Sequence, residues 1–245
     1  MNKHLPPSVH IREVTNALAV INICGPRSRD ILQSVTDADI SNAAYPFFGA
    51  RWIDVGHATV LAVRVGYVGE LGYELYIPQE FGAHVYDTLW AAGAAHGIAN
   101  AGYRAIDSCR MEKGYLYWSG DISPDYNPYE AGLGFCVAME KGDFIGREAL
   151  AKIKAAGLTR KLCSFTIDGF APLHGGEAIF HGDKVVGSTT SVGYGHTSAK
   201  TIAFGYLPIA IAGEKDFIIE AFGKAHKATR GPRCLYDAKM ERLKA

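Results

Sequence analysis

Residues 50–77 read ARWIDVGHATVLAVRVGYVGELGYELYI, and this stretch carries the main signal for the fold. Apolar residues alternate with polar ones in the runs 52–55, 59–65 and 73–77, and glycines interrupt the pattern between the runs. A period of two is typical of strands with one buried face, and glycine is favoured in tight turns. The stretch therefore predicts an antiparallel sheet with turns at its glycines.

The residues before this stretch predict one more strand and a helix. Residues 18–24 form a nearly continuous apolar run that ends at Gly25 and Pro26, which indicates a strand buried on both faces. Proline suits the first turn of a helix, so a helix is expected over residues 27–34.

Two helices are expected after the sheet. Apolar residues recur at helical spacing over residues 80–96, and a second helical segment spans residues 102–113. Gly97 and Gly114 follow them, as is common at helix ends. Both helices are expected to pack on the sheet.

The pattern changes near residue 156, after a further predicted helix over residues 144–156. Short apolar runs then recur at intervals typical of a small all-β barrel, at residues 161–167, 177–180, 185–191, 201–207 and 217–222. The predicted fold is therefore α+β, an antiparallel sheet with packed helices followed by a small C-terminal β-barrel. The predicted domains are residues 1–156 and 157–245.

The composition excludes several classes of partner. The chain of 245 residues has 25 basic and 25 acidic side chains, so no strong positive field is expected to attract nucleic acid. It has no apolar run of about 18 residues, as a membrane-spanning helix would need, and no secretion signal at its start. We expect no membrane partner and a cytoplasmic location.

The sequence also lacks the common signatures of metal and phosphate sites. Its five cysteines are far apart without a C-x-x-C pair, and its nine histidines never lie four residues apart on a predicted helix. The cysteines are expected to be reduced and mostly buried. We predict no metal site.

The most informative motif is Gly66-Tyr67-Val68-Gly69-Glu70-Leu71-Gly72-Tyr73-Glu74, with Arg104 thirty residues later. The motif resembles the aminomethyltransferase family, which comprises the T-protein of the glycine cleavage system and the folate-binding C-terminal modules of dimethylglycine and sarcosine dehydrogenases. Trp118 and the residues of this motif look more similar to the dehydrogenase modules than to the T-protein. Further matching stretches follow in order at residues 25–29, 101–105, 116–121, 130–134, 142–148 and 190–194.

The resemblance implies a tetrahydrofolate site. In that family the residue matching Glu74 binds the pteridine, the one matching Tyr67 lines the pocket, and the one matching Arg104 contributes to folate binding. A carboxylate can accept hydrogen bonds from an amino group and a ring N–H side by side, which a pterin offers. By its position alone, Glu74 could equally be a polar residue on the solvent face of a strand.

The other candidate residues also have structural alternatives. Arg104 could form an i,i+3 ion pair with Asp107, and Tyr67 could simply fill the sheet face. The segment 114–130 is rich in aromatic residues, as in loops that cover a site. Its Tyr115, Trp118 and Asp121 could line the pocket or belong to the core.

Family members carry well over a hundred residues before the part that this chain matches, and the acidic residue held to be central to catalysis lies there. We expect the chain to be N-terminally truncated relative to them, with turnover lower by roughly 10²–10⁴ without that group. The missing strands would expose a sheet edge, which favours self-association or a complementing chain. We name no catalytic residue.

Three functions fit the motifs. The first is one-carbon transfer to tetrahydrofolate in glycine, sarcosine or dimethylglycine catabolism, together with a flavoprotein amine dehydrogenase chain or domain, with FAD not expected in this chain. The second is a non-catalytic folate-binding or assembly subunit. The third is the related folate-binding factor of iron–sulfur pathways, but Asp143 occupies the position of that family's characteristic cysteine.

Overall fold

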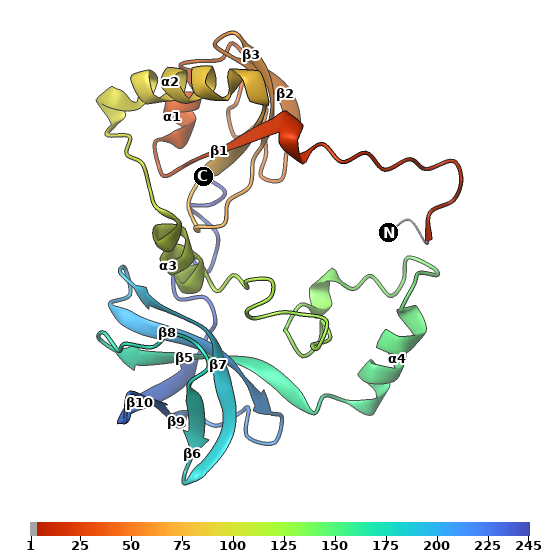
Figure 1. The fold of residues 1–245 in the computed structure, drawn as a ribbon, viewed down its shortest axis with the longest axis vertical. Helices are drawn as coiled ribbons and strands as arrows, with labels where there is room; N and C mark the ends of the chain where they lie inside the picture. Colours follow the sequence, from red (N-terminus) through yellow and green to blue (C-terminus); the bar gives the residue numbers. More distant parts are fainter. Residues whose placement is uncertain (1–3) are drawn as a thin grey trace. The chain divides into compact units, whose positions relative to one another are not determined.

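A computed structural model describes residues 4–245 of the chain (Figure 1). By their contacts these residues divide into two compact units, the first comprising residues up to Asn100 together with Met240–Ala245 and the second comprising Ala101–Lys239. The domain boundary expected after residue 156 stays a prediction.

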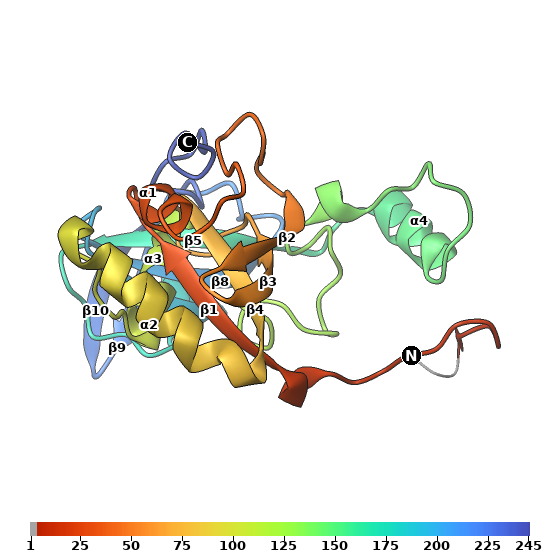
Figure 2. The same cartoon turned by 90° about the horizontal axis from the view of Figure 1, so that it is seen from above.

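The first unit is a four-stranded antiparallel sheet in the order β1-β4-β3-β2, with helices α1 and α2 together on one face (Figures 1 and 2). Its strands are β1 (Leu18–Cys24), β2 (Ala50–Val55), β3 (Ala58–Val63) and β4 (Gly72–Pro78), and its helices are α1 (Ser28–Gln33) and α2 (Gly82–Gly93). The predicted antiparallel sheet is thereby confirmed.

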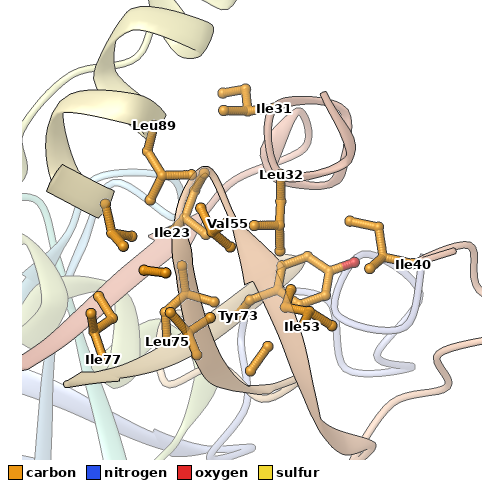
Figure 3. Close-up of a cluster of buried hydrophobic side chains, with 14 of the residues drawn as sticks. Ile23, Ile31, Leu32, Ile40, Ile53, Val55, Tyr73, Leu75, Ile77 and Leu89 are labelled. Carbon is orange, nitrogen blue, oxygen red and sulfur yellow. The ribbon is translucent and has the colours of Figure 1, made fainter. Parts of the chain in front are cut away.

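The core of this unit lies between the sheet and the two helices. Alternate residues of β4, namely Tyr73, Leu75 and Ile77, point into it and are at most 1% exposed. Figure 3 shows them among side chains of the other strands and of both helices, with Leu32 from α1 and Leu89 from α2. Full burial of one such side chain contributes about 1.5–3 kcal/mol, so this face sets the register of the strand.

The predicted burial of β1 on both faces is wrong. β1 pairs only with β4 and lies at one edge of the sheet. Ile23 is buried in the core, whereas Val20, Asn22 and Cys24 alternate with the core-facing residues and are exposed. An antiparallel strand with helices on one side needs only one apolar face, so the continuous apolar run does not report burial on both.

The second unit contains a closed six-stranded antiparallel barrel in the order β10-β5-β8-β7-β6-β9, as the predicted fold class requires. Its strands are β5 (Arg160–Asp168), β6 (Ala178–His181), β7 (Lys184–Gly195), β8 (Lys200–Pro208), β9 (Asp216–Ala221) and β10 (Lys224–Gly231), and its helices are α3 (Tyr103–Lys113) and α4 (Arg147–Ala156). β10 reads KAHKATRG and shows no apolar alternation, which explains why its sequence did not predict a strand.

Helix α3 ends where its sequence predicts, with Gly114 in the left-handed conformation after it, and begins one residue later than predicted. The prediction that it packs on the first sheet is wrong, because α3 packs on β7 and β8 of the barrel. Its buried Met111 contributes to a cluster with barrel residues such as Phe204. The expected burial of the cysteines is also wrong, since Cys163 is the one buried cysteine among the five.

Gly187→Ala is expected to destabilise the barrel by about 1–3 kcal/mol. A Cβ atom on Gly187 would overlap the backbone oxygen of Tyr206, which cannot move without disturbing β8. Gly213→Ala is the matched control in the same unit, because nothing lies near the position of its added methyl group. Urea denaturation of both variants checks this expectation, and equal midpoints would contradict it.

Candidate functional site

Glu74 lies on the face of the first sheet that is turned away from the core. Its neighbours Tyr73 and Leu75 point inward, and the Glu74 side chain is half-buried on the other side. It is opposite Asn22 of β1 and Val63 of β3 in the strand register. The alternation of the strand therefore confirms that Glu74 belongs to the outer face.

The carboxylate of Glu74 has one side-chain partner and spare acceptor capacity. Tyr76, two residues on along the same face, donates a hydrogen bond from Oη to Glu74 Oε2 at 2.9 Å. This bond is the main cause that raises the pKa of the Tyr76 phenol. Among residues 4–245, no hydrogen bond to Glu74 Oε1 occurs. An ionised carboxylate offers about four lone-pair sites, so Glu74 can accept further donors.

The surroundings of Glu74 on this face are largely apolar. The sheet's outer face presents Val20 of β1, Leu61 and Val63 of β3, and Trp52 of β2, which is 62% exposed. An exposed, largely apolar face that also carries a half-buried carboxylate is typical of a face that binds something. A flat ring with donors along one edge fits this combination of groups.

Tyr67 lies in the loop between β3 and β4, and its side chain is 37% exposed. Gly69 in this loop has a φ of +82°, a conformation that side chains rarely adopt. Gly72, at the start of β4, approaches β1 so closely that an added Cβ would lie 3.1 Å from Cys24 Cβ. These glycines are required by the turn and by the close approach of the strands.

Arg104 lies in the first turn of α3 in the second unit, and its side chain is exposed. The alternative ion pair between Arg104 and Asp107 does not form, because Asp107 binds Arg110 instead, with 2.7 Å between Oδ1 and Nε. Arg104 has no ion pair within the described part of the chain. Its guanidinium group is therefore available to an anionic ligand group.

The loop after α3 contains the three other candidate residues in different environments. Trp118 is 64% exposed, whereas Tyr115 is half-buried and its pKa is raised mainly by burial. Asp121 is fully buried. The loop is thus ordered against the barrel, and Trp118 is the member of the three that is most accessible to a ligand.

Asp121 is the centre of a buried polar network. Its Oδ2 accepts from Arg110 Nη1 at 2.9 Å and from the Tyr117 backbone N–H at 2.8 Å, and its Oδ1 accepts from Thr190 Oγ1 at 2.6 Å. Arg110 also donates to Ser191 Oγ at 2.9 Å. The network joins α3, the loop and β7, so Asp121 holds the loop in place.

The sequence did not single out Arg110, Ser191 or Tyr76. The pair of Asp107 and Arg110 at i,i+3 was a possible signal for the first, since such pairs interact on helices. Residues two apart on a strand share a face, so the spacing of Glu74 and Tyr76 was a possible signal for Tyr76. Ser191 is eighty-one residues from Arg110, and nothing local connects them.

Across residues 4–245 no group of three or more metal-ligating side chains comes together. Over the same range, no helix has the length and apolar character needed to cross a membrane.

Two family models match the chain. The GCVT N-terminal domain matches residues 1–141, and the glycine cleavage T-protein C-terminal barrel domain matches residues 160–237. The chain belongs to the glycine cleavage T-protein family. The barrel of β5 to β10 corresponds to the second of these domains.

Several larger proteins are similar to the chain. Mitochondrial sarcosine dehydrogenase of Mus musculus is 42% identical over 93% of the chain and 26% of its own length. Human mitochondrial dimethylglycine dehydrogenase is 37% identical over 96% of the chain and 28% of its length. The mitochondrial pyruvate dehydrogenase phosphatase regulatory subunit of Mus musculus is 34% identical over 84% of the chain and 25% of its length. The chain thus spans about a quarter of these relatives.

The fold also matches a solved structure of the family. The glycine cleavage system aminomethyltransferase T from Bartonella henselae superposes with a TM-score of 0.66, covering 88% of the chain and 83% of that protein. The sequence identity is 19%, so this match concerns the fold alone.

Proposed function

We propose that the chain is a tetrahydrofolate-binding module for one-carbon transfer, working in the catabolism of glycine, sarcosine or dimethylglycine. Glu74 carries the proposal, because it is a half-buried carboxylate with spare acceptor capacity on an apolar sheet face. The sequence similarity to sarcosine and dimethylglycine dehydrogenases supports the choice of substrates.

The residues of this face suit the pterin ring of the cofactor. A pterin has an amino group and a ring N–H on one edge, and a carboxylate accepts both in a bidentate, charge-assisted pair. The faces of the ring are apolar and match side chains such as Val20 and Leu61. Tetrahydrofolate, when bound, would supply the nitrogen that accepts the one-carbon unit.

Two further residues, one in each unit, are proposed to bind groups of a folate. Tyr67 offers an aromatic side chain from the loop that precedes β4, and Arg104 offers a guanidinium group that has no ion pair in residues 4–245. Guanidinium binds carboxylates bidentately, so Arg104 suits the acidic tail of a folate. FAD is not expected in this chain, and the amine oxidation is assigned to a flavoprotein chain or domain that works with it.

Glu74→Ala is expected to weaken binding of tetrahydrofolate at least about tenfold, or about 1.4 kcal/mol. The substitution removes both acceptor oxygens for the donor edge of the pterin. Calorimetric titration of the wild type and the variant with tetrahydrofolate under anaerobic conditions measures the difference.

Glu80→Ala is the control for this titration, because Glu80 is an exposed glutamate of the same unit, next to α2. It should bind like the wild type. Equal affinities of wild type and Glu74→Ala would leave Glu74 as a surface residue and would remove the main support for the proposal.

A second candidate function is a non-catalytic folate-binding or assembly role with a partner chain. The similarity to a regulatory subunit of pyruvate dehydrogenase phosphatase favours it, because that relative is named for regulation. The two functions differ in turnover. A catalytic module should accelerate the capture by tetrahydrofolate of the carbon released by a sarcosine-oxidising flavoprotein, whereas a non-catalytic one should bind tetrahydrofolate and leave the rate unchanged.

A further inference from the structure

Residues 240–245 follow the barrel in sequence but fold with the first unit. Within that unit they contact the β3–β4 loop, residues 64–71, which carries Tyr67. Leu243 is 1% exposed, yet it is not part of the cluster that forms the core between the sheet and its helices. Its burial therefore comes from contacts outside that cluster.

Leu243 packs against the beginning of the loop. A Cβ atom on Gly66 would lie 3.4 Å from Leu243 Cδ1 and 3.1 Å from the backbone oxygen of Glu70. Gly66 is thus enclosed between Leu243 and the far end of its own loop. A Cβ atom at this position would be tight against the Glu70 backbone oxygen and in ordinary van der Waals contact with Leu243.

Arg64 ties the same segment to the first residue of the loop. Its side chain is 1% exposed, and Nη2 donates to the backbone oxygens of Lys244 at 3.0 Å and Ala245 at 2.6 Å. Nη1 donates to the backbone oxygen of Tyr45 at 2.6 Å. A buried guanidinium that lost these acceptors would carry a large desolvation cost, so the bonds hold the segment firmly.

Two further contacts complete the attachment. Arg29 donates from Nη2 to the backbone oxygen of Ala245 at 2.7 Å and from Nε to Tyr73 Oη at 3.1 Å. Arg242 Nη1 lies 3.5 Å from Glu70 Oε1, which is at the other end of the loop. The segment therefore touches the loop at Arg64, at Gly66 and at Glu70, on both sides of Tyr67.

We propose that residues 240–245 are a positioning segment that holds the β3–β4 loop in the conformation in which Tyr67 contributes to the ligand site. The consequence for ligand binding rests on the proposed function, whereas the holding of the loop does not. Leu243 and Arg64 are positioning residues in this scheme. They act through the loop and do not need to touch the ligand.

Leu243→Ala tests the inference by two measurements. Hydrogen exchange of residues 64–71 is expected to become about tenfold faster, because the loop loses the side chain that encloses Gly66. In the β3–β4 loop, the backbone N–H groups of Arg64 and Val65 donate to the backbone oxygens of Gly49 and Val63. The exchange rates of these two groups therefore report loosening of the loop. Binding of tetrahydrofolate is expected to weaken about three- to tenfold in parallel.

Three variants serve as controls. Leu89→Ala truncates a buried leucine of the same unit that packs in the core cluster, so it should lower stability without changing exchange of residues 64–71. Leu243→Met keeps the volume and should behave like the wild type. Leu243→Val removes a smaller part of the side chain, and it replaces Leu243→Ala in the test if Leu243→Ala does not fold.

The outcomes separate the two proposals. Faster exchange and weaker binding in Leu243→Ala, but not in Leu89→Ala, support the inference. Unchanged exchange of residues 64–71 in Leu243→Ala overturns it, whatever the affinity. If exchange is faster in Leu243→Ala but the wild type does not bind tetrahydrofolate, the role of residues 240–245 in holding the loop is supported and the folate site is overturned.

Discussion

Asp121→Ala should destabilise the second unit by about 3–5 kcal/mol, because it leaves the buried guanidinium of Arg110 without its buried counter-charge. The Arg110 side chain is 4% exposed and that of Asp121 is fully buried. The substitution also removes the acceptor for the Tyr117 N–H and for Thr190 Oγ1. Each unsatisfied buried donor adds to the loss.

Hydrogen exchange of β7 and β8 amides at increasing urea concentration measures the opening free energy of this unit. Asp107→Ala is the matched control, because Asp107 binds the same guanidinium at 2.7 Å but is 41% exposed. Its loss should cost at most about 1 kcal/mol, as for exposed ion pairs. Similar losses for the two variants would show that burial of the pair does not matter and would refute the expectation.

Asp121→Asn provides a second test of the same buried ion pair. The asparagine keeps the size and one acceptor oxygen but loses the charge. It should lie between Asp121→Ala and the wild type in stability, because a hydrogen bond to an ionised acceptor is stronger than one to a neutral acceptor.

Leu75→Ala is expected to destabilise the first unit by about 2–5 kcal/mol. Leu75 is fully buried in the core of the sheet, opposite Ile21 of β1 and Ala62 of β3. Removing most of the side chain leaves a cavity that the surrounding strands and helices cannot fill. Urea denaturation followed by the exchange of β3 and β4 amides measures the change.

Val20→Ala is the control for the outer face of the same sheet. Val20 is 51% exposed, so its truncation should cost about 1 kcal/mol or less. The comparison also tests the register that puts Glu74 on the outer face. A slip of one residue would exchange the two faces of β4, and Leu75→Ala would then be the milder change of the two.

Much of the first sheet could be predicted from local pattern. The runs in residues 50–77 alternate because one face of each strand is buried, so β2, β3 and β4 are visible in the sequence. Helix α3 is visible for a similar reason, since Gly114 ends it in the left-handed conformation. The alternation of β4 also assigned Glu74 to the face opposite Tyr73 and Leu75.

The surroundings of the candidate site were not predictable in this way. The buried charged partner of Arg110 is Asp121, and Asp121 also accepts from Thr190, which comes from a strand of the barrel. Tyr76 beside Glu74 is recognised only once the register is known. These contacts depend on long-range packing, which local residue spacing does not report.

By itself the sequence determined the strands and helices with strong periodicity, the class of the fold and the family motif. Each of these depends on residues that are close together in the chain. The tertiary structure decided that β1 is an edge strand, that α3 packs on the barrel and that residues 240–245 belong to the first unit. The physical reason is that the sequence of an apolar helix or strand face does not specify which other face it packs against. The packing partner is selected only when both apolar surfaces are buried together.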